Sequence, residues 1–514
     1  MQSSEQIKHT LKKYWGYDAF RPKQEAIVGD ILAGRDVCVV MPTGGGKSLC
    51  YQLPAALQTE DTAIVVSPLI ALMQDQVAQL KQMGIPAAVL NSSQGWNDQR
   101  EIERRAEGGE YRLLYLSPER LAKKETILWL QKLSISLFVI DEAHCISEWG
   151  HEFRPDYRQL KMLREEYPDK PIAAFTASAT HRVRHDIIEQ LKLQDPGKFI
   201  ASFHRPNLNY QVLECNSQTQ EEQLIAIVKE HNGSPAIVYS PTIKRVASTV
   251  ETLKDAGIPA IGYHAKMDAA ERAKNQTRWM DDEVNVLVGT VAFGLGINKP
   301  DVRAVIHLSL PKSIEQYYQE AGRAGRDGKT SDCFLLWQKR DTALLAHFIE
   351  QIEDEDEKAR GWQRYRDITG FAASKQCRHK RICAHFGESV KWEKCGACDI
   401  CSGAATLSPA SVTPAPRPDK REKKRKKSST ETKSKGAADP ALLKALKEWR
   451  LARAREDGLP AFVIFHDSVL TEISVAKPRT LAALYGIKGV GENKLARYGE
   501  EILRVVAKAT ARKN

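Results

Sequence analysis

The chain has 514 residues, of which 42% are hydrophobic, and a formal net charge of +11. This length predicts about three domains, and no apolar run is long enough for a membrane span or a cleavable leader, so a cytoplasmic protein is expected and no membrane partner. The ten cysteines follow no regular spacing along the chain, which argues against a disulfide framework. The charge is uneven: residues 404–437 hold ten Lys or Arg against three Asp or Glu, and residues 1–403 are close to neutral.

Apolar strands alternate with amphipathic helices from about residue 20 to about residue 340. Runs of Val and Ile, as in residues 62–67, are typical of parallel strands that are buried on both faces. The expected strands lie at 62–67, 111–116, 137–140 and 171–176, and again after residue 200 at 235–240, 259–264, 284–289 and 304–308. This pattern predicts an α/β fold with two tandem, doubly wound parallel sheets and a nucleotide cleft between them.

Residues 41–48 read Met-Pro-Thr-Gly-Gly-Gly-Lys-Ser and lie between an apolar strand, residues 36–41, and the start of a helix. A triphosphate needs close backbone N–H groups, a cation and a metal ion, and this loop offers the first two and a hydroxyl ligand for the third. Lys47 would reach the β- and γ-phosphates, and Ser48 would bind Mg²⁺. The residues expected to hold the nucleotide here are Thr43, Gly44, Gly45, Gly46, Lys47 and Ser48.

A second half of the same site follows the strand at residues 137–140. Asp141 and Glu142 come directly after it, in the sequence Asp-Glu-Ala-His. Asp141 would lie beside the magnesium ion together with Ser48, and Glu142 would act as the general base for water. With the glycine-rich loop, this order predicts an ATP hydrolase that uses Mg²⁺.

Two arginines in the second sheet domain have a spacing that suits phosphate recognition. Arg323 and Arg326 are three residues apart, so on a helix they share a face and can direct guanidinium groups at the γ-phosphate across the cleft. This arrangement is an arginine finger supplied by the same chain. The alternative is a solvated basic helix end, against which Gln319 and the flanking glycines argue.

The loop that follows the catalytic carboxylates is rich in aromatic residues. Trp149, Phe153 and Arg154 lie in a Gly- and Pro-bearing stretch. Such side chains can stack on unpaired bases and report their presence to the hydrolysis site. From the residues alone, an ordinary packing loop is the alternative.

Four cysteines near residue 400 have the spacing of a metal site. They are Cys377, Cys395, Cys398 and Cys401, in the pattern C-x17-C-x2-C-x2-C. Four soft thiolates at this density predict a tetrahedral structural Zn²⁺, whereas reduced core cysteines are the alternative. Cys383 is a fifth thiol and is expected outside the site.

Taken in order, these motifs resemble a superfamily 2 helicase of the RecQ family, with a DEAH box. Residues 17–24 read Tyr-Asp-Ala-Phe-Arg-Pro-Lys-Gln, which is similar to the family's motif ahead of the phosphate loop. In that motif the glutamine reads the adenine edge. The resemblance therefore implies that Gln24 selects ATP, with Arg21 and Tyr17 nearby.

The aromatic loop at residues 145–157 is also similar to a family motif, the aromatic-rich DNA sensor. This resemblance favours nucleic-acid contact over simple packing. It implies DNA contact for Trp149, Phe153 and Arg154, and a role for His151 in coupling DNA to hydrolysis.

The resemblance implies two RecA-like domains, a helical zinc-binding module and a small all-α HRDC (helicase-and-RNase-D C-terminal) domain. The expected limits are 1–200 and 201–340 for the RecA-like domains, 341–403 for the zinc-binding module, 404–437 for a basic linker and 438–514 for HRDC. Within the last domain, Lys488, Lys494 and Arg497 are candidates for phosphate contact, although such domains sometimes bind proteins instead.

RecQ proteins usually carry a winged-helix domain of about a hundred residues after the zinc module, a size typical of one domain. Here only residues 404–437 intervene, and they are too short and too polar to fold. The winged helix is therefore expected to be absent. Two interpretations of the basic linker stay open, a DNA-binding segment and a solvated spacer.

The sequence predicts an ATP-dependent DNA helicase and, by family resemblance, one that moves 3′ to 5′ in repair and recombination. ATP, Mg²⁺ and Zn²⁺ are the expected cofactors. The expected partners are single-stranded and partly duplex DNA and a single-strand DNA-binding protein, with the chain as a monomer. An RNA helicase is disfavoured by the aromatic loop and the zinc module. An ATP-regulated annealing protein stays an alternative, because the winged helix is missing.

Overall fold

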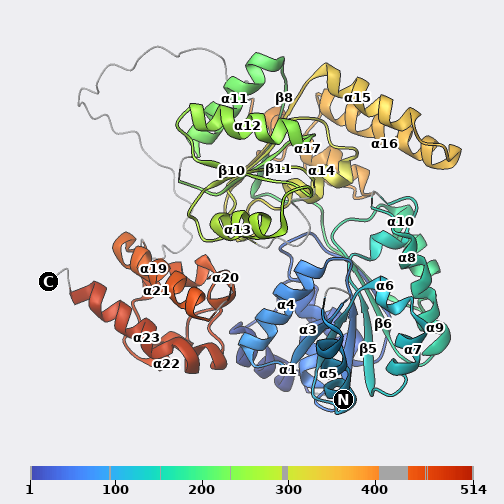
Figure 1. The fold of residues 1–514 in the computed structure, drawn as a ribbon, viewed down its shortest axis with the longest axis vertical. Coiled ribbons are helices and arrows are strands. Elements are labelled where there is room, and N and C mark those ends of the chain that lie inside the picture. The colour runs from blue at the N-terminus through green and yellow to red at the C-terminus, as the bar shows by residue number, and fades with distance from the viewer. Residues whose placement is uncertain are drawn as a thin grey trace.

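The structure is a computed structural model that describes residues 3–91, 94–150, 152–231, 233–291, 299–403, 438–457, 459 and 461–511. The elements form two α/β lobes, a helical module on the second lobe, and a C-terminal helical domain that lies beside both lobes (Figure 1). Within these ranges, no helix is long and apolar enough to cross a membrane.

The first lobe is built on a parallel sheet, which in the described part of the chain has seven strands in the order β3-β4-β2-β5-β6-β1-β7. Its strands are β1 (Val37–Val40), β2 (Thr62–Val66), β3 (Ala87–Leu90), β4 (Leu113–Leu116), β5 (Ile135–Ile140), β6 (Ile172–Thr176) and β7 (Gly197–Ile200). The strands β1 and β2 are buried along their whole length, as expected for apolar strands covered on both faces. The edge strand β7 instead alternates between half-buried and exposed residues.

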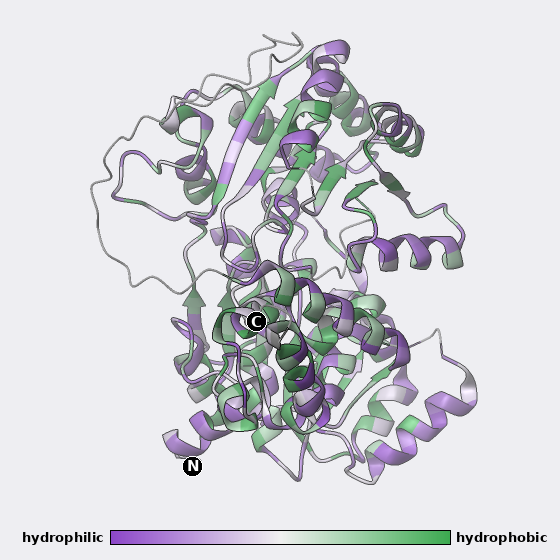
Figure 2. Cartoon of the chain, turned by 90° about the vertical axis from the view of Figure 1, so that its left-hand side faces the viewer, coloured by the Kyte–Doolittle hydropathy of each residue, from purple (hydrophilic) through white to green (hydrophobic). Residues whose placement is uncertain are grey.

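Helices cover both faces of this sheet (Figure 1). They are α1 (Ser4–Thr10), η1 (Leu11–Trp15), α2 (Gln24–Leu32), α3 (Lys47–Leu57), α4 (Ile70–Met83), α5 (Trp96–Glu107), α6 (Pro118–Leu121), α7 (Lys124–Leu130), η2 (Ala143–Ile146), α8 (Pro155–Arg158), η3 (Gln159–Lys161), α9 (Met162–Glu166) and α10 (His181–Gln190). In Figure 2 the strands are mostly hydrophobic, and hydrophilic residues concentrate on the helices around them.

The second lobe repeats this architecture with a smaller parallel sheet. Within the described ranges its strand order is β10-β11-β9-β12-β13-β8. Its elements are β8 (Leu208–Glu214), α11 (Ser217–Glu230), β9 (Ala236–Tyr239), α12 (Ile243–Asp255), β10 (Ala260–Tyr263), α13 (Ala269–Met280), β11 (Val286–Gly289), β12 (Ala304–His307), α14 (Ile314–Ala321) and β13 (Ser331–Trp337). The predicted fold class, two doubly wound parallel-sheet domains, is confirmed.

The strands that sequence periodicity did not predict are β3, β7, β8 and β13. β3 is short and begins with two alanines, and β8 alternates apolar and polar residues. β13 begins with Ser and Asp before its apolar run. These segments lack the continuous apolar runs by which β2 and β5 were identified. Their extended conformation depends instead on hydrogen bonding to a neighbouring strand.

The predicted zinc module, residues 341–403, packs against the second lobe, and its first helix begins at Lys339. Its helices are α15 (Lys339–Glu350), α16 (Glu355–Ala373), α17 (Arg378–His385) and α18 (Asp399–Ser402). The Tyr210 amide on β8 donates to the Ala397 carbonyl (3.2 Å), and the Val212 amide donates to the Asp399 carboxylate (3.3 Å). Arg378 also donates to Asp399 (2.9 Å), so this carboxylate ties the module to the sheet edge.

The C-terminal domain is a small helical bundle. Its helices are α19 (Pro440–Glu456), α20 (Ala461–Ile464), α21 (Asp467–Ala476), α22 (Leu481–Tyr485) and α23 (Glu492–Ala511). Its core includes the fully buried side chains of Leu446, Leu470, Tyr498 and Ile502.

A buried pair between His385 and Glu315 joins the zinc module to helix α14, with 2.7 Å between Nε2 and Oε1. Burial disfavours the imidazolium, but the hydrogen bond to Glu315 outweighs it and raises the pKa of His385. Because the folded-state pKa is raised, this pair stabilises the fold fully below about pH 6.5, the ordinary histidine value, and the stabilisation is lost as pH rises through the raised pKa.

We therefore expect His385→Gln to lower the thermal midpoint by a few degrees at pH 6 and by much less at pH 9. His185→Gln is the matched control, because His185 is exposed and lies 3.7 Å from Glu189 on one helix. Thermal unfolding of both variants at the two pH values checks this. An equal loss for His385→Gln at both values contradicts the assignment.

Candidate functional site

A cavity of about 530 Å³ opens between the two lobes. Nearly all the residues predicted to bind or hydrolyse nucleotide line it: Tyr17, Arg21, Gln24, Thr43, Gly44, Gly46, Lys47, Ser48, Asp141, Glu142, Arg323 and Arg326. These side chains come from the two lobes and are up to about three hundred residues apart in sequence. The fold therefore assembles them into one site.

The glycine-rich loop connects β1 to α3 and curves tightly. Gly44 and Gly46 adopt left-handed φ angles of 82° and 87°. A Cβ atom built at Gly46 would lie 2.4 Å from Nε2 of Gln24, so this position requires glycine. Lys47, at the start of α3, donates to the Met41 carbonyl (3.2 Å). Burial lowers the pKa of Lys47, against the opposing effect of Glu142 and Asp141.

The residues expected to read the base contact this loop through hydrogen bonds. Gln24 donates from Nε2 to the Gly46 carbonyl (3.1 Å) and accepts from the Arg21 amide (2.8 Å). The Arg21 guanidinium donates to the Gly44 carbonyl. The side chain of Gln24 is buried, and Tyr17 and Arg21 lie at the cavity wall. Gln24, Arg21 and the glycine-rich loop thus form one hydrogen-bonded unit.

The two carboxylates follow β5 directly. Glu142 has a left-handed φ of 48°, uncommon for a residue with a Cβ, and this turn directs the chain into the helix η2. Burial, reinforced by the neighbouring Glu142 carboxylate, raises the pKa of Asp141 to about 7. A divalent cation would relieve this repulsion. The oxygen donors of Asp141 and Ser48 are of the kind that Mg²⁺ prefers, so the residues present fit that ion.

The arginines of the second lobe reach the glycine-rich loop across the cleft. The Cα of Arg326 lies 3.5 Å from a Cβ built at Gly44. Burial and the neighbouring charge of Arg323 lower the pKa of Arg326 to about 9. An anion between these guanidinium groups would therefore be stabilised strongly.

Sequence reasoning missed one arginine that holds this arrangement together. Arg205, in the connection between β7 and β8, donates to the carbonyls of Thr43 (3.0 Å) and Gly325 (3.2 Å). It thereby bridges the glycine-rich loop of the first lobe and the arginine turn of the second. A lone arginine in a connecting segment has no periodicity or spacing to single it out.

A chain of polar contacts links the Glu142 carboxylate to the second lobe. His144 Nδ1 lies 3.3 Å from the Glu142 carboxylate and 2.9 Å from the Thr176 hydroxyl. The Ser178 amide donates to the same hydroxyl (3.3 Å), and Gln319 on α14 donates to the Ser178 hydroxyl (3.0 Å). We call these residues, Glu142, His144, Thr176, Ser178 and Gln319, the polar relay.

The polar relay also reaches the aromatic loop. His144 Nε2 lies 3.7 Å from the Glu152 carboxylate in that loop. Burial disfavours the imidazolium, but contacts with Cys145, Glu142 and Glu152 outweigh it and hold the pKa of His144 well above its ordinary value. The buried imidazole therefore lies between two carboxylates, one in the Asp-Glu-Ala-His motif and one in the aromatic loop.

The aromatic side chains themselves face solvent. Trp149 is 38% exposed and Phe153 is 36% exposed, and neither lines the nucleotide cavity. Arg154 donates to the Pro68 carbonyl (3.4 Å), which joins the loop to the start of α4. The predicted coupling residue His151 lies outside the described residues. Exposed rings beside a buried relay suit a loop that senses a ligand.

The four predicted metal-binding cysteines meet in the zinc module. The sulfurs of Cys377, Cys395, Cys398 and Cys401 all lie within 4.8 Å of one another, and those of Cys377 and Cys398 are 4.0 Å apart. Zn–S bonds of about 2.3 Å in a tetrahedron place sulfurs roughly 3.8 Å apart, so the set fits Zn²⁺. Cys383 is buried and is not a member of the set, as predicted.

The C-terminal domain lies against the first lobe at the mouth of the cleft. The Gly489 amide donates to the Gly16 carbonyl (3.0 Å), and Lys488 lies over the Tyr17 ring, 5.7 Å from its centre. Tyr498 donates to the Gln82 side chain (3.0 Å). Residues of this domain therefore line the nucleotide cavity as well, among them Val463, Phe465, His466, Lys488 and Gly489.

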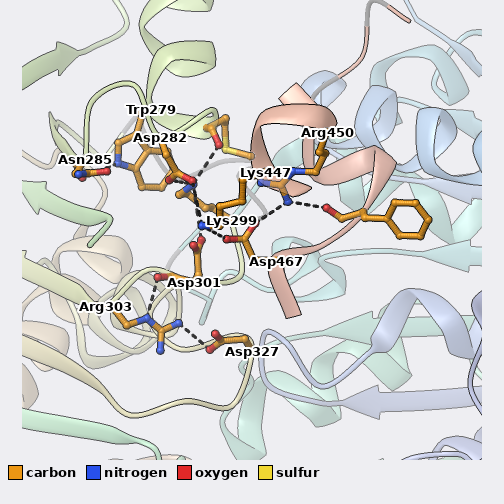
Figure 3. Close-up of polar contacts among 12 residues, drawn as sticks. Trp279, Asp282, Asn285, Lys299, Asp301, Arg303, Asp327, Lys447, Arg450 and Asp467 are labelled. Carbon is orange, nitrogen blue, oxygen red and sulfur yellow. Dashed lines mark hydrogen bonds and ion pairs between the residues drawn. The ribbon is translucent and has the colours of Figure 1, made fainter. Parts of the chain in front are cut away.

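The same domain meets the second lobe through a cluster of ion pairs (Figure 3). Lys447 lies 2.6 Å from Asp467 in its own domain and 3.8 Å from Asp282 in the second lobe. Lys299 pairs with Asp282 (2.7 Å) and lies 3.7 Å from Asp301. The C-terminal domain thus contacts both lobes.

One prediction for this domain is wrong. Lys494 was expected to face phosphate, but its side chain is buried and donates to the carbonyls of Val463 (2.9 Å) and Ile464 (2.8 Å). Burial lowers its pKa to about 8. Arg497 pairs with Asp457 (3.2 Å). The end of a short helix needs a donor for its carbonyls, which the sequence alone did not reveal.

Family models match four consecutive stretches of the chain. They are described as DEAD/DEAH box helicase (residues 21–187), helicase conserved C-terminal domain (219–328), RecQ zinc-binding (339–402) and HRDC domain (439–506). No winged-helix model matches, as predicted. The first two matches cover the two lobes around the cavity, and these lobes define the core of a helicase.

Relatives narrow this class further. The chain is 41% identical over 391 residues to the ATP-dependent DNA helicase RecQ of Pasteurella multocida, covering 76% of this chain and 61% of that protein. It is 34% identical over 582 residues to that of Bacillus subtilis, covering 96% of this chain and 97% of that protein. A solved structure of the helicase MrfA bound to DNA and AMPPNP is similar in fold (TM-score 0.54, 20% identity, 65% of this chain and 51% of that one). The chain belongs to the RecQ family.

Removing one sulfur ligand tests the zinc site. We expect Cys398→Ala to lower the zinc content from about one ion per chain to near zero and to lower the thermal midpoint, because three thiolates hold the ion far more weakly. Metal analysis of the purified protein gives the stoichiometry. Cys383→Ala is the matched control, since it removes a buried thiol outside the set, and loss of zinc from that variant instead would refute the assignment.

The hydrogen bond between Gln319 and Ser178 is open to a double-mutant cycle. Gln319→Ala and Ser178→Ala should each lower kcat for ATP hydrolysis about fivefold, and the double variant little further, because one neutral hydrogen bond is worth about 1 kcal/mol. Ser178→Thr keeps the hydroxyl and should keep the rate. Gln316→Ala is the control, since Gln316 bonds Glu320 within α14. Fully additive losses would show that the two side chains act separately.

Proposed function

We propose that this chain is an ATP-dependent DNA helicase that translocates 3′ to 5′ on single strands and unwinds duplex DNA. Membership of the RecQ family supports the reaction class, as does a cavity that gathers phosphate-binding and hydrolytic residues from two lobes. The observation that carries the proposal is the polar relay. It connects the exposed aromatic loop to the catalytic carboxylate and to the second lobe.

In this proposal each residue of the cavity has a defined task. Lys47 and the backbone of the glycine-rich loop hold the β- and γ-phosphates. Glu142 accepts a proton from the attacking water, and Arg323 and Arg326 stabilise the charge of the transferring phosphoryl group. Mg²⁺, held by Asp141 and Ser48, neutralises phosphate charge when bound.

DNA is coupled to this chemistry through the aromatic loop. A base that stacks on Trp149 or Phe153 shifts the loop, and with it the Glu152 carboxylate. The buried His144 ring contacts Glu152, Glu142 and Thr176, so a shift of Glu152 changes the position of the ring relative to Glu142 and Thr176. Gln319 passes the change to the second lobe, and closure of the lobes on ATP then alternates with opening after hydrolysis.

The proposed domain limits are 1–200, 201–340, 341–403, 404–437 and 438–514. We propose single-stranded and partly duplex DNA as the substrate, a single-strand DNA-binding protein as a partner, a monomeric chain, and a role in repair and recombination in the cytoplasm. Because the chain spans only 61% of the Pasteurella multocida relative, these assignments concern this chain by itself. Trp149, Phe153, Arg154 and His151 are the proposed DNA contacts.

Strand displacement on tailed duplexes tests the activity and its direction. With ATP, the chain should release the strand from a 3′-tailed duplex and leave a 5′-tailed duplex intact. Glu142→Gln should lower both hydrolysis and displacement at least about 100-fold, because it removes the general base. Displacement of the 5′-tailed duplex alone would reverse the direction.

A second candidate is an ATP-regulated annealing protein, which the missing winged helix favours. Its signature in the same assay is ATP hydrolysis stimulated by single strands with no displacement of either duplex. That result would refute the helicase proposal and support the alternative. Annealing of complementary strands, measured with and without ATP, then completes the assignment.

A further inference from the structure

The indole ring of Trp149 lies against guanidinium groups from two different parts of the molecule. The Cζ atom of Arg182 is 3.0 Å from the centre of the ring, and that of Arg360 is 5.3 Å from it. Arg182 belongs to α10 of the first lobe, and Arg360 belongs to α16 of the zinc module. The exposed tip of the aromatic loop is therefore held by two cations.

The two arginines differ in their other contacts. Arg360 donates to Glu357 (2.9 Å) and lies 3.8 Å from Glu148, the residue before Trp149. Arg182 is exposed and forms no ion pair or hydrogen bond with the residues that the structure describes. Its guanidinium group thus contacts the indole ring, and its N–H groups remain available to donate hydrogen bonds to an anion.

Stacking of the ring on a base would compete with this contact. Arg182 lies so close to the indole that a base needs the same space on that face of the ring. Guanidinium and base both bind an aromatic face with modest strength, so one can replace the other. A guanidinium released beside a stacked base lies near the backbone phosphates, which it binds through charge-assisted hydrogen bonds.

We propose that Arg182 and Arg360 form a resting cradle for Trp149, and that single-stranded DNA takes Trp149 out of this cradle while its phosphates bind the two guanidinium groups. The inference rests on the proposed role of the aromatic loop in DNA binding. It adds two positioning residues, one on each side of the loop, and a reason why DNA changes the loop.

The position of Arg182 suits it to pass this exchange to the hydrolysis site. Helix α10 begins at His181, directly after Thr180, whose hydroxyl caps the helix by accepting from the Val183 amide (3.4 Å). Ser178 of the polar relay lies four residues before Arg182. A phosphate that draws Arg182 toward the strand therefore pulls on the segment that contacts the second lobe.

The salt dependence of single-strand binding tests the phosphate contacts. Binding of a labelled oligo-dT to the full chain without nucleotide is measured by fluorescence anisotropy between 50 and 200 mM salt. Arg182→Gln and Arg360→Gln should each reduce the slope of log affinity against log salt by about 0.7, and the double variant by about 1.4, since each removes one phosphate contact. Arg182→Lys keeps the charge and should keep the slope.

Arg366→Gln is the matched control, because Arg366 is exposed on the same helix as Arg360 and donates its hydrogen bond to Gln363 of that helix (2.8 Å). Its slope should equal that of the unaltered chain. Unchanged slopes for both Arg182→Gln and Arg360→Gln would overturn the cradle. In that case Trp149→Ala shows which proposal has failed. If Trp149→Ala leaves DNA binding and DNA-stimulated ATP hydrolysis unchanged, the proposed role of the aromatic loop is wrong as well. If Trp149→Ala abolishes the stimulation of ATP hydrolysis by DNA, only the cradle is wrong.

Tryptophan emission reports the release directly. Subtracting the emission spectrum of the Trp149→Phe variant from that of the unaltered chain gives the emission of Trp149 alone. The same subtraction is made in a chain that also carries Arg182→Gln and Arg360→Gln. Without DNA, the emission of Trp149 in the double variant should move to longer wavelength, because the ring has left its cradle for water. Identical emission in both backgrounds would overturn the proposal.

Discussion

The contacts of the buried His144 side chain join the two parts of the molecule on which the proposed function depends. A buried polar ring is stable only when it has polar partners, and two carboxylates lie beside this one, those of Glu142 and Glu152. One belongs to the hydrolytic motif and the other to the loop that faces solvent. A displacement of either carboxylate would change the surroundings of the same buried imidazole, and this is the physical basis of the proposed coupling between the loop and the hydrolysis site.

The remaining contacts between the parts are of two kinds. The first lobe meets the second through single polar side chains, Arg205 and Gln319, which are few and directional. The zinc module instead is fixed to β8 by backbone hydrogen bonds and by the Asp399 carboxylate. The proposed motion of the lobes would therefore require only these few side-chain contacts to exchange, whereas the zinc module would stay with the second lobe.

Much of the fold and most of the nucleotide site could be predicted because their signals are local. The glycine-rich loop, the carboxylates after β5 and the paired arginines each occupy a few consecutive residues, and parallel strands with continuous apolar runs are easy to recognise. Arg205, the half-exposed β7 and the buried Lys494 could not be predicted, because their roles depend on partners far away in sequence. The contact between Gln82 and Tyr498, for example, joins residues that are 416 positions apart.

The position of the HRDC domain changes how a truncated chain should be interpreted. Lys488 and Phe465 form part of the nucleotide cavity wall, and Gly489 is hydrogen-bonded to Gly16. Cutting the chain before this domain removes a candidate DNA-binding unit and at the same time opens the ATP pocket to water on one side. A comparison of the intact chain with the shortened one therefore measures the loss of the candidate DNA-binding unit and the opening of the pocket together. A change in nucleotide affinity between the two chains is then not evidence that DNA binding at this domain affects the nucleotide site.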